Sequence, residues 1–367
     1  MRVTQNSTAN NALYNIQQLS KKLDSLQESI SSQQNVNRPS DDPISSGTLL
    51  DIGDRLKALD QYATNITKAN TWVKFTDTTL TGMSDIIMQT KKLVGTINSG
   101  STDPSMRQSA HDQLVDLKKQ IIDMGNTQMG DQYILGGAKS NVAPFVQKTG
   151  NLNASTTVAN IDVSSLTVDM HVSGTGIPSG TTITAVTAGP PSSITLSNAA
   201  TATATASTLN FYAGDSSQLT IEIARGTTQA VGLTGDRLLK GTSTPAGTLP
   251  DYGSIDILQT FDNLIASVGD KNTASNAPNL TQASIDLQAG FVQITNAVGD
   301  NIARMTRLDN MTKLNDINKN MMQTIIGNIQ EVDNAQLGME LSRQKIAYEA
   351  SLAATAKIAQ LSLLNFL

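Results

Sequence analysis

The chain has 367 residues, of which 38% are hydrophobic and 4% aromatic, and its formal net charge is -5. This length can form two or three compact units, and so few aromatic residues are unusual for an enzyme with a deep substrate pocket. The acidic balance, without any long run of Lys or Arg, argues against nucleic acid as a partner.

Cysteine does not occur in the sequence, which excludes disulfides, thiol catalysis and cysteine-ligated metals. The first residues form no continuous apolar core, so we expect no cleaved secretory signal. The most apolar stretch, 351–367, is broken by Lys357 and Gln360 and is too short to cross a bilayer. We therefore expect no membrane insertion.

An apolar heptad pattern opens the chain, with steps of four and three between Ala12, Ile16, Leu19, Leu23, Leu26 and Ile30. This spacing predicts a helix that packs against a partner helix, as in a coiled coil. Residues 37–47 interrupt the pattern. Pro39 disfavours helix at Arg38, and Asp42 before Pro43 predicts a helix N-cap followed by a first-turn proline.

Further apolar residues at helical spacing predict helices over 49–97, 105–129, 255–268, 281–332 and 337–366. In the last of these, the predicted apolar seam consists of Leu337, Leu341, Tyr348, Leu352, Ala359, Leu363 and Phe366. Near the end of this helix, Leu361, Leu363 and Leu364 point in different directions around the helix axis. One partner helix therefore cannot cover all of these apolar side chains.

The composition changes after residue 137 and stays rich in Thr, Ser, Ala, Gly and Val until about residue 250. Alternating runs over 181–186, 193–196 and 219–223 predict β-strands. The order of helices, β-rich insert and helices, with apolar seams at both ends of the chain, implies that the two ends meet.

We therefore predict a mainly α fold with an inserted β domain. The N- and C-terminal helices form an elongated helical-bundle or coiled-coil rod, and the β domain lies at its distal end. Residues 1–43 and 331–367 are predicted to form a terminal coiled-coil assembly domain. Residues 44–140 and 251–330 form the helical rod domain, and residues 141–250 form the β-rich tip.

No pattern in the sequence predicts a catalytic, cofactor or metal site. His111 and His171 are the only histidines, and neither has the spacing of a metal site or a catalytic triad. The glycines of 174–180 lie among predicted strands and lack the dinucleotide-binding order, and in 235–242 the lysine precedes the glycine that it should follow in a P-loop. The sequence therefore favours a protein that is not an enzyme and needs no cofactor.

Two stretches, NRPSDDPISSG at 37–47 and the segment 331–367 that ends in LSLLNFL, together resemble the flagellin family. The resemblance covers roughly 1–145 and 210–367. The remaining residues, about 150–209, depart from the family and resemble a short β module of surface and phage tail proteins.

The resemblance implies a structural subunit of the bacterial flagellum that is exported through the flagellar type III channel and is extracellular. It implies self-association in a ring at the junction of hook and filament. The implied partners are a neighbouring hook-associated protein, flagellin and an export chaperone. Two alternatives are a minor or divergent flagellin and a surface adhesin whose β domain binds carbohydrate, for which Phe211 and Tyr212 are among the few aromatic residues.

The residues predicted to carry assembly lie in the two terminal segments. Asp41 and Asp42 can be considered as a general acid and base, but a capping role beside Pro43 explains them without a pocket. The predicted assembly residues are Asn37, Arg38, Pro39, Ser40, Asp41, Asp42, Pro43, Leu352, Leu361, Leu363, Leu364 and Phe366.

Overall fold

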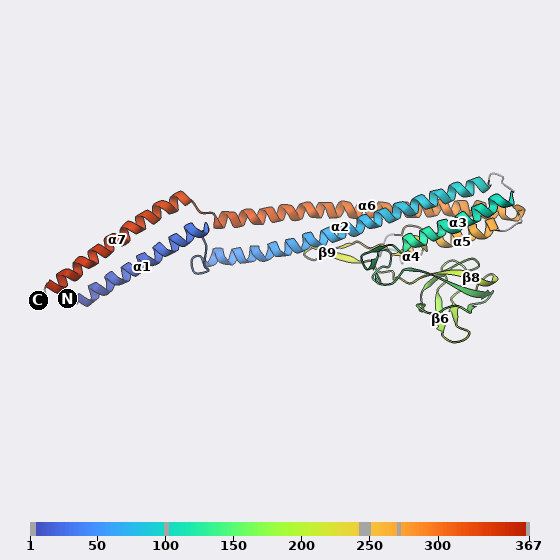
Figure 1. The fold of residues 1–367 in the computed structure, drawn as a ribbon, viewed down its shortest axis with the longest axis horizontal. Coiled ribbons are helices and arrows are strands. Elements are labelled where there is room, and N and C mark those ends of the chain that lie inside the picture. Colours follow the sequence, from blue (N-terminus) through green and yellow to red (C-terminus); the bar gives the residue numbers. More distant parts are fainter. Residues whose placement is uncertain (1–4, 99–102, 242–250, 270–272, 365–367) are drawn as a thin grey trace. The chain divides into compact units, whose positions relative to one another are not determined.

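The computed structural model describes residues 5–98, 103–241, 251–269 and 273–364, without the side chains of 5–9, 98, 273–279 and 358–364 (Figure 1). The described residues form two compact units, one from the ranges 1–61 and 314–367 and the other from 62–313. Long helices join the two units in sequence, because both α2 (Pro43–Asn98) and α6 (Thr273–Gln330) contribute to each.

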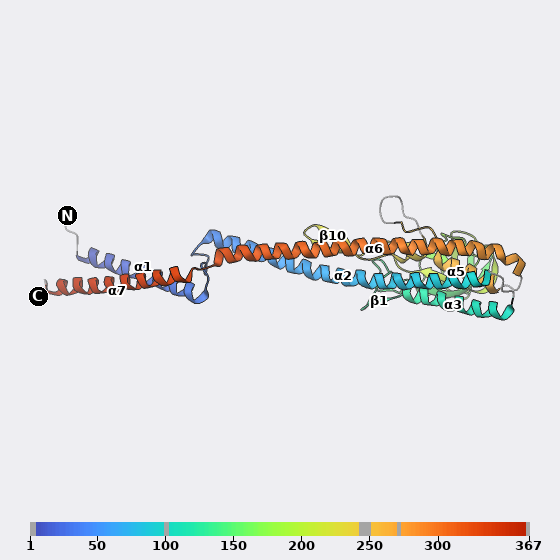
Figure 2. The ribbon, with the colours of Figure 1, turned by 90° about the horizontal axis from the view of Figure 1, so that it is seen from above.

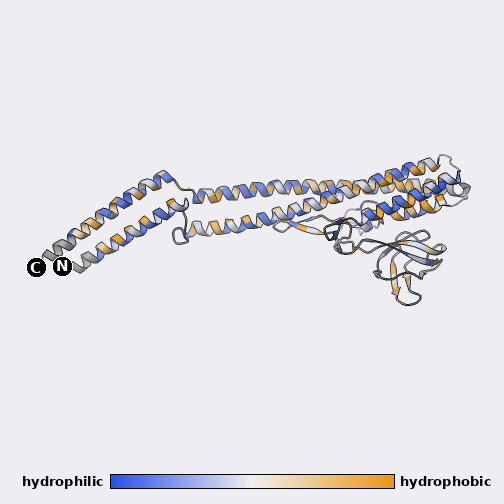
Figure 3. Ribbon diagram, in the orientation of Figure 1, coloured by the Kyte–Doolittle hydropathy of each residue, from blue (hydrophilic) through white to orange (hydrophobic). Residues whose placement is uncertain are grey.

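The first unit contains α1 (Gln5–Ser32) and α7 (Asn334–Leu364), which lie side by side (Figures 1 and 2). The apolar seam predicted for α1 is confirmed, since Ala12, Ile16, Leu19, Leu23, Leu26 and Ile30 are all half-buried. In Figure 3 apolar and polar residues alternate along both helices. The pair therefore packs through a narrow stripe on α1, as the heptad spacing indicates.

The seam of α7 differs from the prediction in one respect. Leu337, Leu341 and Tyr348 are half-buried as predicted, but Leu352 is 43% exposed. After Tyr348 the buried side advances by three residues to Ser351 instead of four to Leu352, and it continues at Thr355. Leu352 therefore lies on the flank of the α1–α7 contact.

The second unit packs the remaining parts of α2 and α6 with α3 (Pro104–Gly125) and α5 (Ile257–Gly269) around one hydrophobic core. Asp103 caps α3 by accepting from the Ser105 N–H at 2.9 Å. The prediction extended this helix to residue 129, but it ends at Gly125. Residues 128–133 instead form the hairpin β1 (Gln128–Met129) and β2 (Gln132–Tyr133), which turns at Gly130 with a φ of 62°.

The same core covers the short helix α4 (Gly235–Leu239) and the antiparallel hairpin of β9 (Thr220–Ala224) and β10 (Thr227–Ala230). The predicted strand over 219–223 is thus confirmed as β9. Its partner β10 was not predicted, because Thr227–Ala230 is a short polar run.

The β insert is a six-stranded antiparallel sheet in the order β5-β8-β3-β4-β7-β6. Its strands are β3 (Phe145–Asn153), β4 (Thr157–Ala159), β5 (His171–Ser173), β6 (Ile183–Thr187), β7 (Ser193–Leu196) and β8 (Thr203–Tyr212). The predicted strands over 181–186 and 193–196 are confirmed as β6 and β7.

Hydrogen bonds between the first and last strands close this sheet into a barrel. The Val172 N–H donates to the Thr181 carbonyl at 2.9 Å, the Ile183 N–H to Met170 at 2.9 Å, and the Asp169 N–H to Ile183 at 2.8 Å. The interior is filled by apolar side chains that form a second core, among them Leu152, Val158, Ile183, Ile194, Leu209 and Phe211. The barrel is thus a packed structure without a lumen.

The barrel meets the helices through buried polar groups. Lys118 on α3 donates to Asp262 on α5, with 2.6 Å between Nζ and Oδ1. The second carboxylate oxygen of Asp262 accepts from the Asn210 side chain on β8 at 2.9 Å. Lys240 donates to the Asn210 carbonyl at 3.1 Å and to the Ser173 hydroxyl on β5.

Burial has the largest effect on the pKa values of Asp262 and Lys240. It raises the pKa of Asp262, although Lys118 opposes the shift, and it lowers the pKa of Lys240. The folded chain therefore binds the Asp262 proton more tightly than the unfolded chain does. The contribution of this carboxyl to stability accordingly decreases as the pH rises from its ordinary pKa of 3.8 through the raised value.

Replacement of Asp262 by Ala should leave the Lys118 ammonium, whose side chain is 7% exposed, without its nearest anion. We expect the free energy of unfolding in urea to fall by about 3–5 kcal/mol, because one member of a buried ion pair has been removed. Asp54→Ala, which breaks the exposed pair with Lys57, is the control and should have a much smaller effect. The double variant Lys118→Met/Asp262→Leu should recover most of the loss. An equal effect of the two single variants would contradict this account.

Candidate assembly site

Two breaks in the helices lie next to each other in the first unit. One is the loop 33–42 between α1 and α2, and the other is 331–333 between α6 and α7. The Asn35 N–H donates to the Gln330 carbonyl at 3.1 Å and joins the two breaks. The chain therefore changes direction at matching points on both sides of the helical pair.

Each helix that restarts after these breaks is capped by an aspartate. Asp42 accepts from the main-chain N–H groups of Ile44 at 3.0 Å and Ser45 at 3.1 Å, which confirms the predicted N-cap of α2. Asp333 caps α7 in the same way, accepting from Ala335 and Gln336 at 2.9 and 3.1 Å. The second cap was not predicted, although an Asp followed by a helical pattern is its signal.

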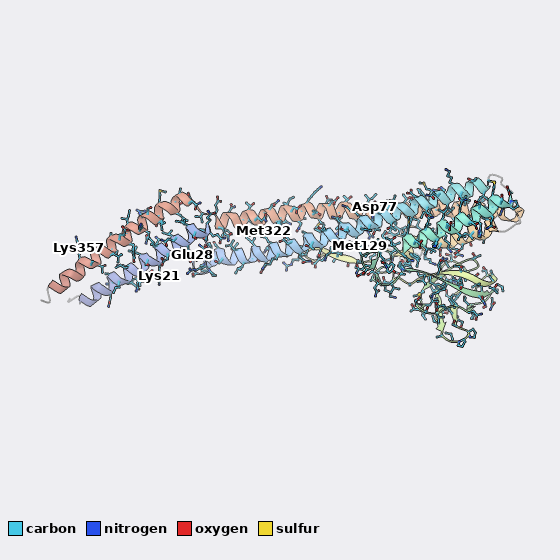
Figure 4. The ribbon with its side chains drawn as sticks, viewed as in Figure 1. Lys21, Glu28, Asp77, Met129, Met322 and Lys357 are labelled. Carbon is cyan, nitrogen blue, oxygen red and sulfur yellow. The ribbon has the colours of Figure 1, made fainter. Side chains whose placement is uncertain are left out.

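The predicted assembly residues 37–43 form the corner before α2. Asp41 closes a turn by accepting from the Arg38 N–H at 2.9 Å, so the two neighbouring aspartates have different structural roles. The Arg38 guanidinium contacts both carboxylate oxygens of Glu28, at 3.2 Å and 2.8 Å. Glu28 lies on α1 and is labelled in Figure 4. The Asn37 side chain donates to the Gln34 carbonyl at 3.1 Å, while Pro39, Ser40 and Pro43 are exposed.

Polar residues also mark the pairing of α1 with α7. Lys22 lies 3.4 Å from Glu340, and Gln344 is 8% exposed within the α1-facing side of α7. A buried polar residue in an otherwise apolar seam favours one register of the two helices, because other registers leave it against an apolar neighbour. The seam was predicted from its apolar residues alone, and Gln344 was missed.

Buried asparagines on α6 contact the main chain of α2. In the first unit the Asn315 side chain donates to the Leu59 carbonyl at 3.0 Å. In the second unit the Asn301 side chain donates to the Val73 carbonyl at 3.0 Å and to Asp77, labelled in Figure 4, at 3.4 Å. Each contact fixes the position of α6 along α2. An Asn within an apolar helical pattern is the sequence signal for such a contact.

A second apolar stripe lies on α7 away from α1. Met339 and Ile346 are 69% and 67% exposed. They are seven residues apart and so share one side of the helix. Each lies two residues before a seam position, Leu341 or Tyr348, which places it about 200° around the axis. The helix therefore presents apolar groups on two opposite sides.

Other exposed apolar side chains of the first unit belong to α1, α2 and α6. Leu13 and Tyr14 on α1 are 54% and 60% exposed. Ile44 and Leu50 on α2 are 83% and 70% exposed, and α6 exposes Leu314, Ile317 and Met321 at steps of three and four. Of the predicted C-terminal assembly residues, Leu352 is described on α7. The side chains of Leu361, Leu363 and Leu364, and all of Phe366, lie outside the described residues.

The described residues hold no group of three or more His, Asp or Glu side chains placed to bind a metal. His111 contacts Asp112, and burial lowers the pKa of His171. Within the same part of the chain, no helix is both long and apolar enough to cross a membrane.

The helical N-terminal part of the chain has a known counterpart. Residues 3–140, which include α1, α2 and α3, match the family of the bacterial flagellin N-terminal helical region. This part of the chain is therefore similar to the N-terminal helical region of flagellin. The match includes the corner at residues 37–43 and the capped start of α2.

Similar proteins carry flagellar names. The chain is 28% identical over 126 residues to flagellar hook-associated protein 3 of Salmonella typhimurium, a match that spans 34% of this chain and only 40% of that protein. The structure of a protein from Vibrio parahaemolyticus, described as a flagellar hook-associated protein, has a TM-score of 0.53 at 19% identity and covers 79% of this chain and all of that one. Bacillus cereus FlgL has a TM-score of 0.46 at 12% identity, over 76% of this chain and 99% of that one. The Vibrio likeness shows a shared fold.

The cap at Asp42 should depend on pH. Hydrogen bonds from Ser45, first from its hydroxyl and then from its main-chain N–H, hold the pKa of Asp42 below its ordinary value of 3.8. The stabilisation is complete above that ordinary value and is lost as the pH falls through the lowered pKa. We expect the amide proton signals of Ile44 and Ser45 to shift over that range in NMR spectra. In Asp42→Asn, which caps without titrating, the shift should vanish, and a shift that persists would assign the titration to another group.

Proposed function

We propose that this chain is a structural subunit of the extracellular bacterial flagellum, located at the junction of hook and filament, and that it is not an enzyme. The similarity to flagellar hook-associated protein 3 supports this place in the flagellum. Under this proposal the chain is exported and assembles with copies of itself in a ring, next to a hook-associated protein and flagellin. An export chaperone is a further proposed partner.

The second apolar stripe of α7, formed by Met339 and Ile346, is the observation that supports self-association. Large apolar side chains such as Met339 and Ile346 each lose about 1.5–3 kcal/mol of stabilisation by staying in water. Their spacing of seven residues is that of a helix–helix seam. Neighbouring copies of the terminal helices supply such a seam in a ring, since every copy presents the same stripe.

The predicted corner at residues 37–43 fits this proposal as the support of the terminal helices. The Arg38–Glu28 contact and the bond from Asn35 to Gln330 hold the two breaks in a defined geometry. The C-terminal residues Leu361, Leu363, Leu364 and Phe366 remain predicted contacts with neighbouring subunits.

Two alternatives have different consequences. The flagellin match over residues 3–140 also fits a minor or divergent flagellin, which would be found along the filament. A carbohydrate-binding adhesin is disfavoured, because Phe211 and Tyr212 are buried and cannot stack on a sugar at the surface.

We further propose the domain division 1–43 with 331–367, 44–140 with 251–330, and 141–250. The separate core of the barrel supports an autonomous insert within the last range, although β9, β10 and α4 of that range pack in the core of the helices. Gln147 and Asn210 are paired neighbours on β3 and β8, so a two-residue turn can replace residues 148–209 and keep the Asn210 contacts with Asp262 and Lys240.

Immunoelectron microscopy of flagella should show the labelled protein as one short band between hook and filament. Because the terminal helices carry assembly in this account, the chain lacking 148–209 should appear at the same place. Label along the whole filament would favour the flagellin alternative. A shortened chain that keeps its helical circular dichroism but is absent from the band would contradict the dispensable role of the barrel.

The double variant Met339→Glu/Ile346→Glu should keep the helical signal of the monomer, since both side chains are exposed. It should fail to join the band at the junction, because carboxylates desolvated in a helix–helix seam are costly. Ala347→Glu/Ala354→Glu, with the same spacing on exposed positions about 100° around the axis from Ile346, is the matched control and should assemble. Normal assembly of the first variant would exclude this stripe as a subunit contact.

A further inference from the structure

A buried arginine without a counter-charge lies on α4. Arg237 is 2% exposed, and its Nε and Nη1 atoms have no hydrogen-bond partner in the structure. Within the described residues, no carboxylate forms an ion pair with it. A guanidinium keeps its proton at any accessible pH, so burial cannot neutralise it as it can a lysine.

The carboxylates near Arg237 serve other groups. Asp236 accepts from the Ser216 hydroxyl at 2.6 Å and from the main-chain N–H of Arg237 at 2.8 Å. Asp300 accepts from the Tyr252 hydroxyl at 2.8 Å and pairs with Arg304 at 2.7 Å. The charges of Arg304, Asp300 and Arg237 all act on Tyr252, so the two guanidinium groups lie in the same part of the interior.

A second unpaired donor precedes Arg237 by one helical turn. Thr234 is 1% exposed, and its hydroxyl has no hydrogen-bond partner in the structure. Thr234 is the residue before α4, yet its side chain makes no capping hydrogen bond. Thr234 is the N-cap and Arg237 the third residue of α4, and these are the two positions whose side chains approach each other in a capping box. The hydroxyl and the guanidinium are thus available to one ligand.

We propose that Arg237 and Thr234 hold a small inorganic anion, chloride or a compact oxyanion such as phosphate, in the interior beside α6. The Gln293 side chain joins α4 to α6 by donating to the Leu238 carbonyl at 2.8 Å. Water can satisfy the N–H groups of a guanidinium, but only an anion offsets its charge in a medium of low dielectric constant. This proposal concerns the folding of the second unit and is independent of the flagellar function.

The test is the thermal unfolding of the purified full chain at constant ionic strength. Sodium gluconate, whose anion is too large for this interior, is replaced stepwise by sodium chloride in one series and by sodium phosphate in another. An anion that binds only the folded chain raises the ratio of folded to unfolded protein about a hundredfold at a hundred times its dissociation constant. We expect the melting temperature to rise in at least one series, and the series that responds identifies the anion.

Arg237→Met removes the charge at similar length and should abolish the rise, while being at least as stable as the native chain in gluconate. Arg225→Met, on an exposed arginine of the same unit, is the matched control and should keep the rise. If Arg237→Met does not fold, Arg237→Lys provides the second variant, because a buried lysine can lose its proton; its melting temperature should depend less on the anion. A native melting temperature that is independent of both anions, or an equal rise in Arg237→Met, would overturn the proposal.

Discussion

The long helix α6 is held by polar side chains that donate to main-chain carbonyl groups of other segments. Asn301 and Asn315 reach carbonyls of α2, and Arg304 reaches the Gly232 carbonyl at 2.9 Å. Gln293 is fully buried and donates to the carbonyls of Leu238 at 2.8 Å and Ile255 at 3.0 Å. Apolar packing alone allows a long helix to slide by a turn at little cost. A buried amide does not, because a displaced amide loses its acceptor.

The two units differ in how much of their apolar surface they cover. The second unit has a continuous core from α2 to α6, with many side chains of zero exposure. In the first unit the α1 seam is only half-buried, and several of the largest exposed apolar residues of the described chain belong to α2, α6 and α7. A two-helix layer has no second side to bury against. In the proposed ring, neighbouring molecules would cover the apolar surface that the terminal helices leave exposed.

Much of the helical fold could be predicted from the sequence, because heptad spacing, Asp–Pro pairs and the change in composition each report a local physical constraint. Asp42 as N-cap and the α1 seam are examples. The seam of α7 was misplaced at Leu352, since the choice between a step of three and a step of four depends on the partner helix. Closure of the barrel through residues 169–172 and 181–183 could not be predicted from the sequence either, because no pattern in these two segments indicates that they pair. The same holds for the Lys118–Asp262 contact, whose two residues are 144 positions apart.

In the proposed ring, identical inserts would lie close together, and for such an arrangement it matters that the sheet of the insert is closed. An open sheet offers rows of free N–H and C=O groups, and neighbouring copies would bring identical rows together at high local concentration. Such rows pair readily, and the product is an irregular aggregate instead of an ordered array. Because β5 bonds back to the segment that begins β6, most of this edge is already occupied within each molecule. In the proposed ring, neighbouring inserts could then touch without pairing their strands, and the helices would make the contacts between chains.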